Sequence, residues 1–222
     1  MWKGIIYKEW LKIRWFLLIY AGLGVLTVIY IFIRIHHDIS FSSPNGYWYN
    51  ALFMGMQYFA LLKFLPVAGA LSIALAQYFP ETVNKRIKLT FHLPVNENKT
   101  LLNIWLFGAA TLLLSYLVQF VLFLALSMVY FPSDIYVPAI VSILPWYLAG
   151  LTCYNLAALI VLEPIWKYRI LYLTITVLFL PLYLQNAPTA AYSPVIPYLI
   201  ILVLFSSFSL LFSGYRLRKG EM

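Results

Sequence analysis

Charged residues and cysteine are scarce in this sequence of 222 residues. Only 10% of the residues are Asp, Glu, Lys or Arg, whereas 64% are hydrophobic and the mean hydropathy is +0.87. A soluble globular protein carries about 25% charged residues, so this composition excludes that class. The single cysteine, Cys153, lies in an apolar segment and cannot form an intrachain disulfide. We therefore expect an integral membrane protein.

Sequence motifs for enzymatic chemistry are missing as well. The chain contains no G-x-S-x-G nucleophile elbow, no H-E-x-x-H zinc helix and no paired aspartates within an apolar segment. It also lacks a phosphate-binding loop, so any ATP that drives this protein binds to another chain. We expect a chain that is not an enzyme and that holds no cofactor of its own.

The best candidates for metal ligands are the neighbours His36, His37 and Asp38. Adjacent histidines in an extended loop point in opposite directions, and the third histidine, His92, is predicted on the other side of the membrane. We therefore expect no metal site, and the sequence leaves the role of His36 and His37 open.

The length and the apolar segments of the sequence leave room for about six helical spans, each of which takes about 20 residues to cross a bilayer. They predict spans at about 15–34, 51–79, 101–130, 137–162, 170–185 and 195–213, which together form one transmembrane domain over 15–222. The second segment is longer than a membrane requires. It is therefore expected to tilt, to kink at Pro66 or to begin outside the hydrocarbon. The predicted fold is all-α with six transmembrane helices.

Residues 1–14 are too polar to span a membrane. Trp2 and Trp10 fall on one helical face, while Lys8 and Lys12 lie together away from it. Tryptophan favours the headgroup level of a bilayer. We predict an amphipathic interfacial helix that leads into the first span.

Lysine and arginine gather on one side of the predicted membrane. Of the fifteen, all but Arg34 and Lys63 lie in the N-terminal segment, the 80–100 loop, the 163–169 loop or the C-terminal tail. Basic residues mark the cytoplasmic side, so both termini are predicted to lie in the cytoplasm, with the chain in the plasma or inner membrane. The net charge of +8 does not indicate nucleic-acid binding, because no basic face with stacking aromatics is present.

The 80–100 loop is the one long polar stretch between spans. Val83, Ile87 and Phe91 recur every four residues, so they share one face of a short helix, and lysines occupy the other face. Pro94 then ends this helix. An amphipathic helix on a cytoplasmic loop suits docking to a partner protein; the alternative is that it rests on the lipid surface.

Few polar side chains interrupt the spans. A lysine at the centre of a membrane helix costs about 2.5–3.5 kcal/mol, so Lys63 either reaches the outer surface or lines a substrate path. Gln57, Gln119 and Asn155 either hydrogen-bond between helices, at roughly 1 kcal/mol each, or join Lys63 on that path. No acidic residue lies near the middle of a span, which argues against a proton- or sodium-coupled carrier.

With these elements placed, the chain resembles the permease subunits of ABC-2 type transporters. In that family the loop between spans two and three starts with an acidic residue, continues with basic residues and a Leu-Pro-Val-like stretch, and ends at a lysine. The matching residues here are Glu81, Lys85-Arg86, Leu93-Pro94-Val95 and Lys99. The N-terminal Lys8-Glu9-Trp10-Leu11-Lys12 also resembles the family's lysine-glutamate start.

The resemblance implies a function and partners. The loop would form a coupling helix that docks on a separate ABC ATPase subunit, which binds ATP and magnesium, and a second permease chain would complete a homodimer or heterodimer. The implied docking residues are Glu81, Val83, Lys85, Arg86, Ile87, Phe91, Leu93 and Pro94. The chain would then be the membrane subunit of an exporter. Its cargo is unidentified, and the 18 tyrosines and 16 phenylalanines suit an amphiphilic one.

Two other interpretations fit the same sequence. The chain is then either a membrane anchor or scaffold that recruits a cytoplasmic partner through the 80–100 loop, or an ATP-independent carrier. An ATPase subunit that co-purifies with the chain distinguishes the first interpretation from both.

Overall fold

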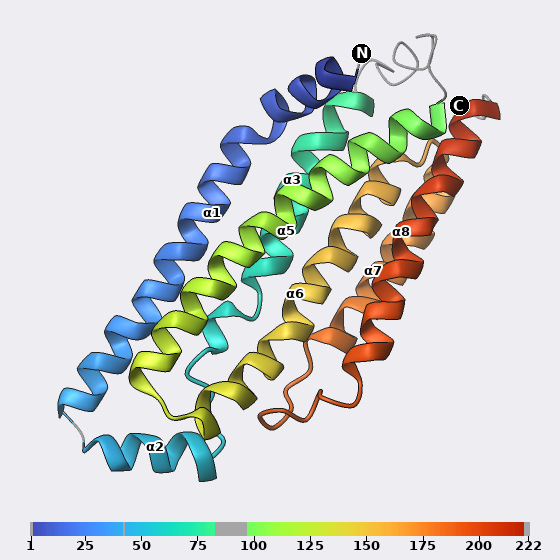
Figure 1. Ribbon diagram of the computed structural model, residues 1–222. Coiled ribbons are helices and arrows are strands. Elements are labelled where there is room, and N and C mark those ends of the chain that lie inside the picture. Colours follow the sequence, from blue (N-terminus) through green and yellow to red (C-terminus); the bar gives the residue numbers. More distant parts are fainter. Residues whose placement is uncertain (1, 42, 83–96, 220–222) are drawn as a thin grey trace.

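The computed structural model describes residues 2–41, 43–82 and 97–219. Every regular element in these ranges is a helix (Figure 1). By length and composition, four helical stretches among the described residues are able to cross a membrane: Gly4–Phe41, Ala60–Thr82, Lys99–Tyr130 and Ser133–Leu162. The chain is thus an all-helical membrane protein, as the sequence predicted, and the number of six spans stays a prediction.

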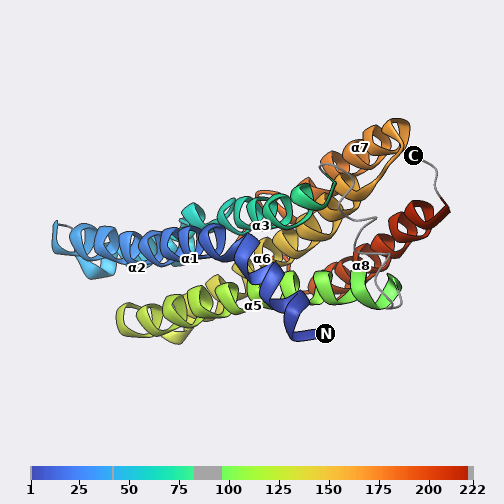
Figure 2. The same cartoon turned by 90° about the horizontal axis from the view of Figure 1, so that it is seen from above.

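The first helix, α1 (Trp2–Phe41), is continuous from the predicted interfacial segment through the predicted first span. No proline interrupts these residues, and the helix shows no break at residue 14. At 1.5 Å per residue its 40 residues measure about 60 Å, about twice the thickness of a hydrocarbon core. α1 is therefore longer than a membrane span requires, and in Figure 2 its first turns diverge from the line of the rest.

The segment predicted as one span over 51–79 is divided. A short helix, α2 (Pro44–Phe53), is followed by irregular chain, the 3-10 helix η1 (Ala60–Leu62) and then α3 (Leu65–Thr82). Figure 1 shows α2 lying across the end of the bundle. The segment is therefore not one continuous helix, and where it begins relative to the hydrocarbon stays a prediction.

Local sequence explains this division. The Ser43 side chain accepts a hydrogen bond from the Gly46 N–H at the start of α2, and Pro44 occupies the first turn, where a missing N–H is tolerated. After α2 the chain turns at Gly55, whose φ of +65° favours glycine. Pro66 lies in the first turn of α3, so it begins a helix and does not kink one.

The helices α5 (Glu97–Tyr130) and α6 (Ser133–Leu162) agree with the predicted third and fourth spans. Of the four apolar helices, α6 is the most buried. It packs against α3, α5, α7 and α8 and so forms the centre of the bundle. Gly150 permits a close approach to α3, because a Cβ at this position would lie 2.8 Å from the Pro66 carbonyl oxygen.

The last two helices, α7 (Trp166–Tyr183) and α8 (Ile196–Lys219), correspond to the predicted fifth and sixth spans. Both pack on α6, and the linker 184–195 joins them. Thr152 of α6 donates a hydrogen bond to the Tyr183 hydroxyl of α7 at 3.0 Å. That these two helices cross the membrane stays a prediction.

The bundle has two distinct ends (Figure 1). The first turns of α1 and the last turns of α8 lie at one end, here called the terminal end. The short helix α2 and the linker 184–195 lie at the other, here called the α2 end.

Candidate functional site

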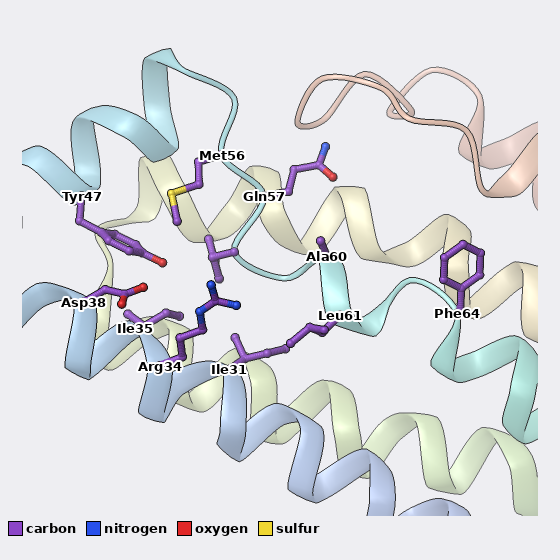
Figure 3. A pocket seen from close by; sticks show the side chains of 11 residues that line it. Ile31, Arg34, Ile35, Asp38, Tyr47, Met56, Gln57, Ala60, Leu61 and Phe64 are labelled. Atoms are coloured by element: carbon purple, nitrogen blue, oxygen red, sulfur yellow. The ribbon is translucent and has the colours of Figure 1, made fainter.

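Lys63 and Gln57 both contact the linker between α7 and α8. Lys63, half-buried after η1, donates a hydrogen bond to the Asn186 side chain, and Gln57 donates one to the Ala187 carbonyl at 2.8 Å. Figure 3 shows the Gln57 side chain directed away from Arg34. These two residues therefore attach the linker to the chain that precedes α3.

Gln119 lies inside the bundle, between α5 and α1. It is 1% exposed, and its side-chain oxygen accepts a hydrogen bond from the Tyr20 hydroxyl at 3.4 Å. Its amide nitrogen has no hydrogen-bond partner among the described residues. A Cβ at Gly24 would collide with this amide, so Gln119 fills the space that the glycine leaves on α1.

Asn155 joins three helices. Its side-chain oxygen accepts from the Trp105 indole N–H of α5 at 2.8 Å, and its amide donates to the Ser206 hydroxyl of α8 at 2.8 Å. Such bonds between membrane helices contribute about 0.6–2 kcal/mol each. The four residues predicted for a substrate path thus lie in three separate groups: Lys63 with Gln57 at the α2 end, Gln119, and Asn155.

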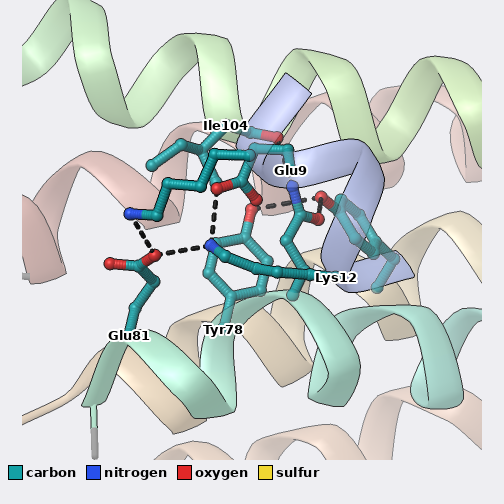
Figure 4. A network of polar contacts seen from close by, with 8 residues as sticks. Glu9, Lys12, Tyr78, Glu81 and Ile104 are labelled. Atoms are coloured by element: carbon teal, nitrogen blue, oxygen red, sulfur yellow. Dashed lines mark hydrogen bonds and ion pairs between the residues drawn. The ribbon is translucent and has the colours of Figure 1, made fainter. Parts of the chain in front are cut away.

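A buried ionic cluster lies at the terminal end (Figure 4). Lys12 of α1 contacts both Glu9 of its own helix and Glu81 of α3, and Lys8 lies 2.7 Å from the same Glu81 oxygen. Glu9 is fully buried and Glu81 is 2% exposed. A buried carboxylate is tolerated only when cations pair with it, and this cluster supplies two.

Uncharged polar groups extend this cluster toward the bundle centre. Gln77 of α3 donates to the Ile104 carbonyl of α5 at 2.6 Å and accepts from the Tyr154 hydroxyl of α6 at 2.7 Å. The Tyr78 hydroxyl lies 3.1 Å from the Tyr154 hydroxyl. All three side chains are buried. Together with the ionic cluster they form one polar network, here called the terminal network, that connects α1, α3, α5 and α6.

The two carboxylates of the network have opposite pKa shifts. Both lie outside the spans that the sequence predicts at about 15–34 and 51–79. Burial raises the pKa of Glu9, and Lys12 offsets only part of this effect. Burial also opposes ionisation of Glu81, but hydrogen bonds and charge from Lys12 and Lys8 outweigh it and lower the pKa of Glu81. Glu81 is therefore an ionised carboxylate at neutral pH.

One predicted docking residue, Glu81, is buried against another helix of the same chain. Glu81 faces α1 and is buried there, although the resemblance assigned it to contact with an ATPase subunit. The spacing of Lys8 and Lys12, which puts both on one helical face, was the sequence signal for an acidic partner. The other predicted docking residues lie outside the described residues: Val83, Lys85, Arg86, Ile87, Phe91, Leu93 and Pro94.

The described ranges contain no group of three His, Cys, Asp or Glu residues that is able to hold a metal ion. His36 and His37 lie in the last turns of α1, which corrects the expectation of an extended loop. The His36 ring packs on Tyr130, and the His37 ring nitrogen Nδ1 lies 3.5 Å from the Asp38 carboxylate.

Comparison with known proteins adds no relative: no family model, curated protein or solved structure matches this chain. The function is therefore inferred from the residues themselves. Among the described residues, the terminal network connects four helices through buried polar contacts. Its residue Glu81 lies at the end of α3, where the 80–100 loop begins.

Proposed function

We propose that this chain is the membrane-spanning permease subunit of an ATP-driven exporter of the ABC-2 type. In this proposal the terminal end faces the cytoplasm, and α7 and α8 are the fifth and sixth spans. A second permease chain pairs with this one. A separate ATPase subunit binds ATP and docks on the 80–100 loop, so the chain itself carries out no chemistry.

The observation that supports this proposal is the burial of Glu81 against α1. Glu81 is the penultimate residue of α3, immediately before the segment expected to dock the ATPase subunit. A movement of that segment displaces the end of α3. Glu81 is buried and its two lysines are partly exposed, so separating these pairs costs about 1–3 kcal/mol, and α1 therefore moves with α3.

The rest of the terminal network carries the same movement further. The 80–100 loop leaves α3 and returns into α5, and the hydrogen bond from Gln77 to the Ile104 carbonyl joins these two helices. Tyr154 adds α6, the centre of the bundle. A docked subunit thus acts on four helices at once. Through these contacts, ATP hydrolysis in that subunit would be coupled to a rearrangement of the bundle.

Affinity purification tests the proposal. The tagged chain is purified in mild detergent, co-purifying proteins are identified by mass spectrometry, and ATPase activity is measured. We expect a stoichiometric ATP-binding subunit that is lost from the double variant Ile87→Ala, Phe91→Ala. The variant Lys8→Gln, Lys12→Gln should keep the subunit but lose coupling between ATP hydrolysis and transport.

The control is Arg14→Gln, which changes an exposed cation on the same helix and should leave both properties unchanged. A chain that purifies alone, or with a partner that lacks ATPase activity, would overturn the transporter proposal. The scaffold interpretation would then replace it.

A further inference from the structure

A cavity of about 500 Å³ opens at the α2 end, between α1, α2 and the chain around η1 (Figure 3). Its volume lies within the range of ligand pockets in proteins, about 300–1,000 Å³. Most of its wall is apolar, and Arg34, Asp38 and Tyr47 supply charge and a hydroxyl group. The terminal network lies at the opposite end of the bundle, so this cavity is a separate feature.

Arg34 and Asp38 bring both signs of charge to this cavity. They are four residues apart on α1 and therefore share one helical face. Among the described residues, Arg34 forms neither an ion pair nor a hydrogen bond, and Asp38 forms an ion pair only with the neighbouring His37 ring. The cavity thus contains a cation and an anion that do not neutralise each other by direct contact.

Tyr47 marks the polar end of the cavity. It comes from α2, is 6% exposed and packs its ring on Phe131. Burial raises the pKa of Tyr47 to about 12, with a further increase from the Asp38 charge and an opposing effect from Arg34. Both charged groups therefore act on this hydroxyl, and the three side chains form one polar region.

The other end of the cavity is apolar. Ile31 of α1, Leu61 of η1 and Phe64 before α3 line it, and Figure 3 shows these three on the far side of Arg34 from Tyr47. Leu61 and Phe64 are exposed, so this wall is open to an apolar chain. The cavity is thus polar near the end of the bundle and apolar toward its middle, which matches a molecule with a charged head and a hydrocarbon tail.

We propose that this cavity binds a zwitterionic amphiphile whose headgroup carries a phosphate and a primary ammonium. The Arg34 guanidinium donates to the phosphate, for which its planar fork is suited. The Asp38 carboxylate accepts from the ammonium, and the hydrocarbon chain lies along Ile31, Leu61 and Phe64. Asp38 disfavours a purely anionic head, and Arg34 disfavours a purely cationic one. This inference rests on the proposed function, for which it names the class of cargo.

Binding to the isolated chain tests this inference. The purified protein in non-ionic detergent is titrated with three single-chain probes of equal chain length: lysophosphatidylethanolamine, lysophosphatidylglycerol and an alkylamine. Binding is followed by native mass spectrometry. We expect the zwitterionic probe to bind at least about tenfold more tightly than either of the others, a difference of about 1.4 kcal/mol.

Two charge-removing variants should change the preference in opposite directions. Asp38→Asn should shift it to the anionic probe, and Arg34→Gln should shift it to the cationic probe. The control Arg14→Gln removes an exposed charge near the other end of the same helix and should keep the wild-type order. Equal affinity for all three probes, or variants that weaken every probe equally, would overturn the inference.

Two further variants keep the test informative if a charge-removing variant fails to fold. Arg34→Lys keeps the cation and should keep the preference for the zwitterion. Ala60→Trp fills the cavity from its wall and should abolish binding of all three probes, whereas retained binding would contradict the assigned location. The binding measurement needs no ATPase subunit. Failure to co-purify that subunit would therefore overturn the proposed function and, with it, the role of the ligand as cargo, whereas failure to bind the zwitterionic probe would overturn only this inference.

Discussion

Glu81 links α3 to α1 through ion pairs. It is 2% exposed and pairs with two lysines, of which Lys12 also contacts Glu9. A carboxylate in such a place is stable only while its cations remain, because burial alone opposes ionisation. The same charge pattern on a solvated surface would contribute almost nothing to stability.

Glu81→Gln should lower the free energy of unfolding by about 1–3 kcal/mol, because it leaves Lys8 and Lys12 without the charge of their shared partner. The lysines are partly exposed and regain water, so a larger loss is not expected. Thermal unfolding of the detergent-purified protein measures the effect. Asp134→Asn changes an exposed carboxylate at the α2 end and should shift the melting temperature little. Equal shifts for both variants would contradict the proposed role of the pairs.

The contribution of Glu81 should also depend on pH. Because its pKa lies below the ordinary value of 4.5, its stabilisation is fully present above pH 4.5 and is lost as the pH falls through the lower folded-state pKa. The raised pKa of Glu9 acts with the opposite sign, because it favours the folded state only at low pH. The comparison of wild type with Glu81→Gln removes the first effect, together with the smaller increase that the Glu81 charge causes in the pKa of Glu9.

We therefore expect the difference in melting temperature between wild type and Glu81→Gln to be constant near neutral pH and to shrink below pH 4.5. Thermal unfolding in a series of buffers measures it. A difference that stays the same throughout acidification would show that Glu81 does not stabilise the protein as a carboxylate.

The packing of α6 against α3 depends on a glycine in α6. At Gly150 a Cβ would meet the Tyr116 hydroxyl and would lie 2.8 Å from the Pro66 carbonyl oxygen. The backbone cannot yield as a flexible side chain does, and Tyr116 already donates a hydrogen bond to this carbonyl at 2.8 Å. Small residues let membrane helices approach closely, and here this approach places α6 at the centre of the bundle.

Gly150→Ala should therefore destabilise the protein by about 1–3 kcal/mol, because α3 and α6 have to separate. Gly22→Ala is the matched control: nothing lies within 4 Å of its added Cβ, so it should be neutral or stabilise α1 by up to about 1 kcal/mol. Thermal unfolding of both variants, side by side, measures the contrast. A stable Gly150→Ala protein would mean that the two helices are less tightly packed than described.

A cysteine-labelling experiment tests the predicted orientation of the bundle in the membrane. Asp134 is exposed at the start of α6, at the α2 end of the bundle. Lys167 is exposed in the first turn of α7, at the terminal end. The natural Cys153 is 4% exposed, so the unmodified chain provides a background that reacts little.

In intact cells, Asp134→Cys should react with a membrane-impermeant maleimide, whereas Lys167→Cys should react only after the membrane is opened. This result follows if the basic end of the bundle stays in the cytoplasm. The reverse pattern would invert the topology and place the 80–100 loop outside the cell. Labelling of both positions from outside would contradict the membrane span predicted between them.

Composition and hydropathy alone determined that this is a helical membrane protein. In a bilayer the backbone polar groups have to be satisfied within each segment, so a long apolar stretch such as 101–130 or 137–162 forms a helix whatever its neighbours are. The charges at the ends of these segments are equally local, and the predicted orientation depends only on counting them.

The tertiary structure decided where the segment over 51–79 becomes a helix and what the polar side chains contact. Hydropathy does not register a turn at Gly55 or a helix that begins at Leu65, because the residues on both sides are equally apolar. Glu81 is separated by about seventy residues from Lys8 and Lys12, so its burial depends on the packing of α1 against α3. Arg34 and Tyr47 likewise line one cavity only because α2 folds back across the end of α1.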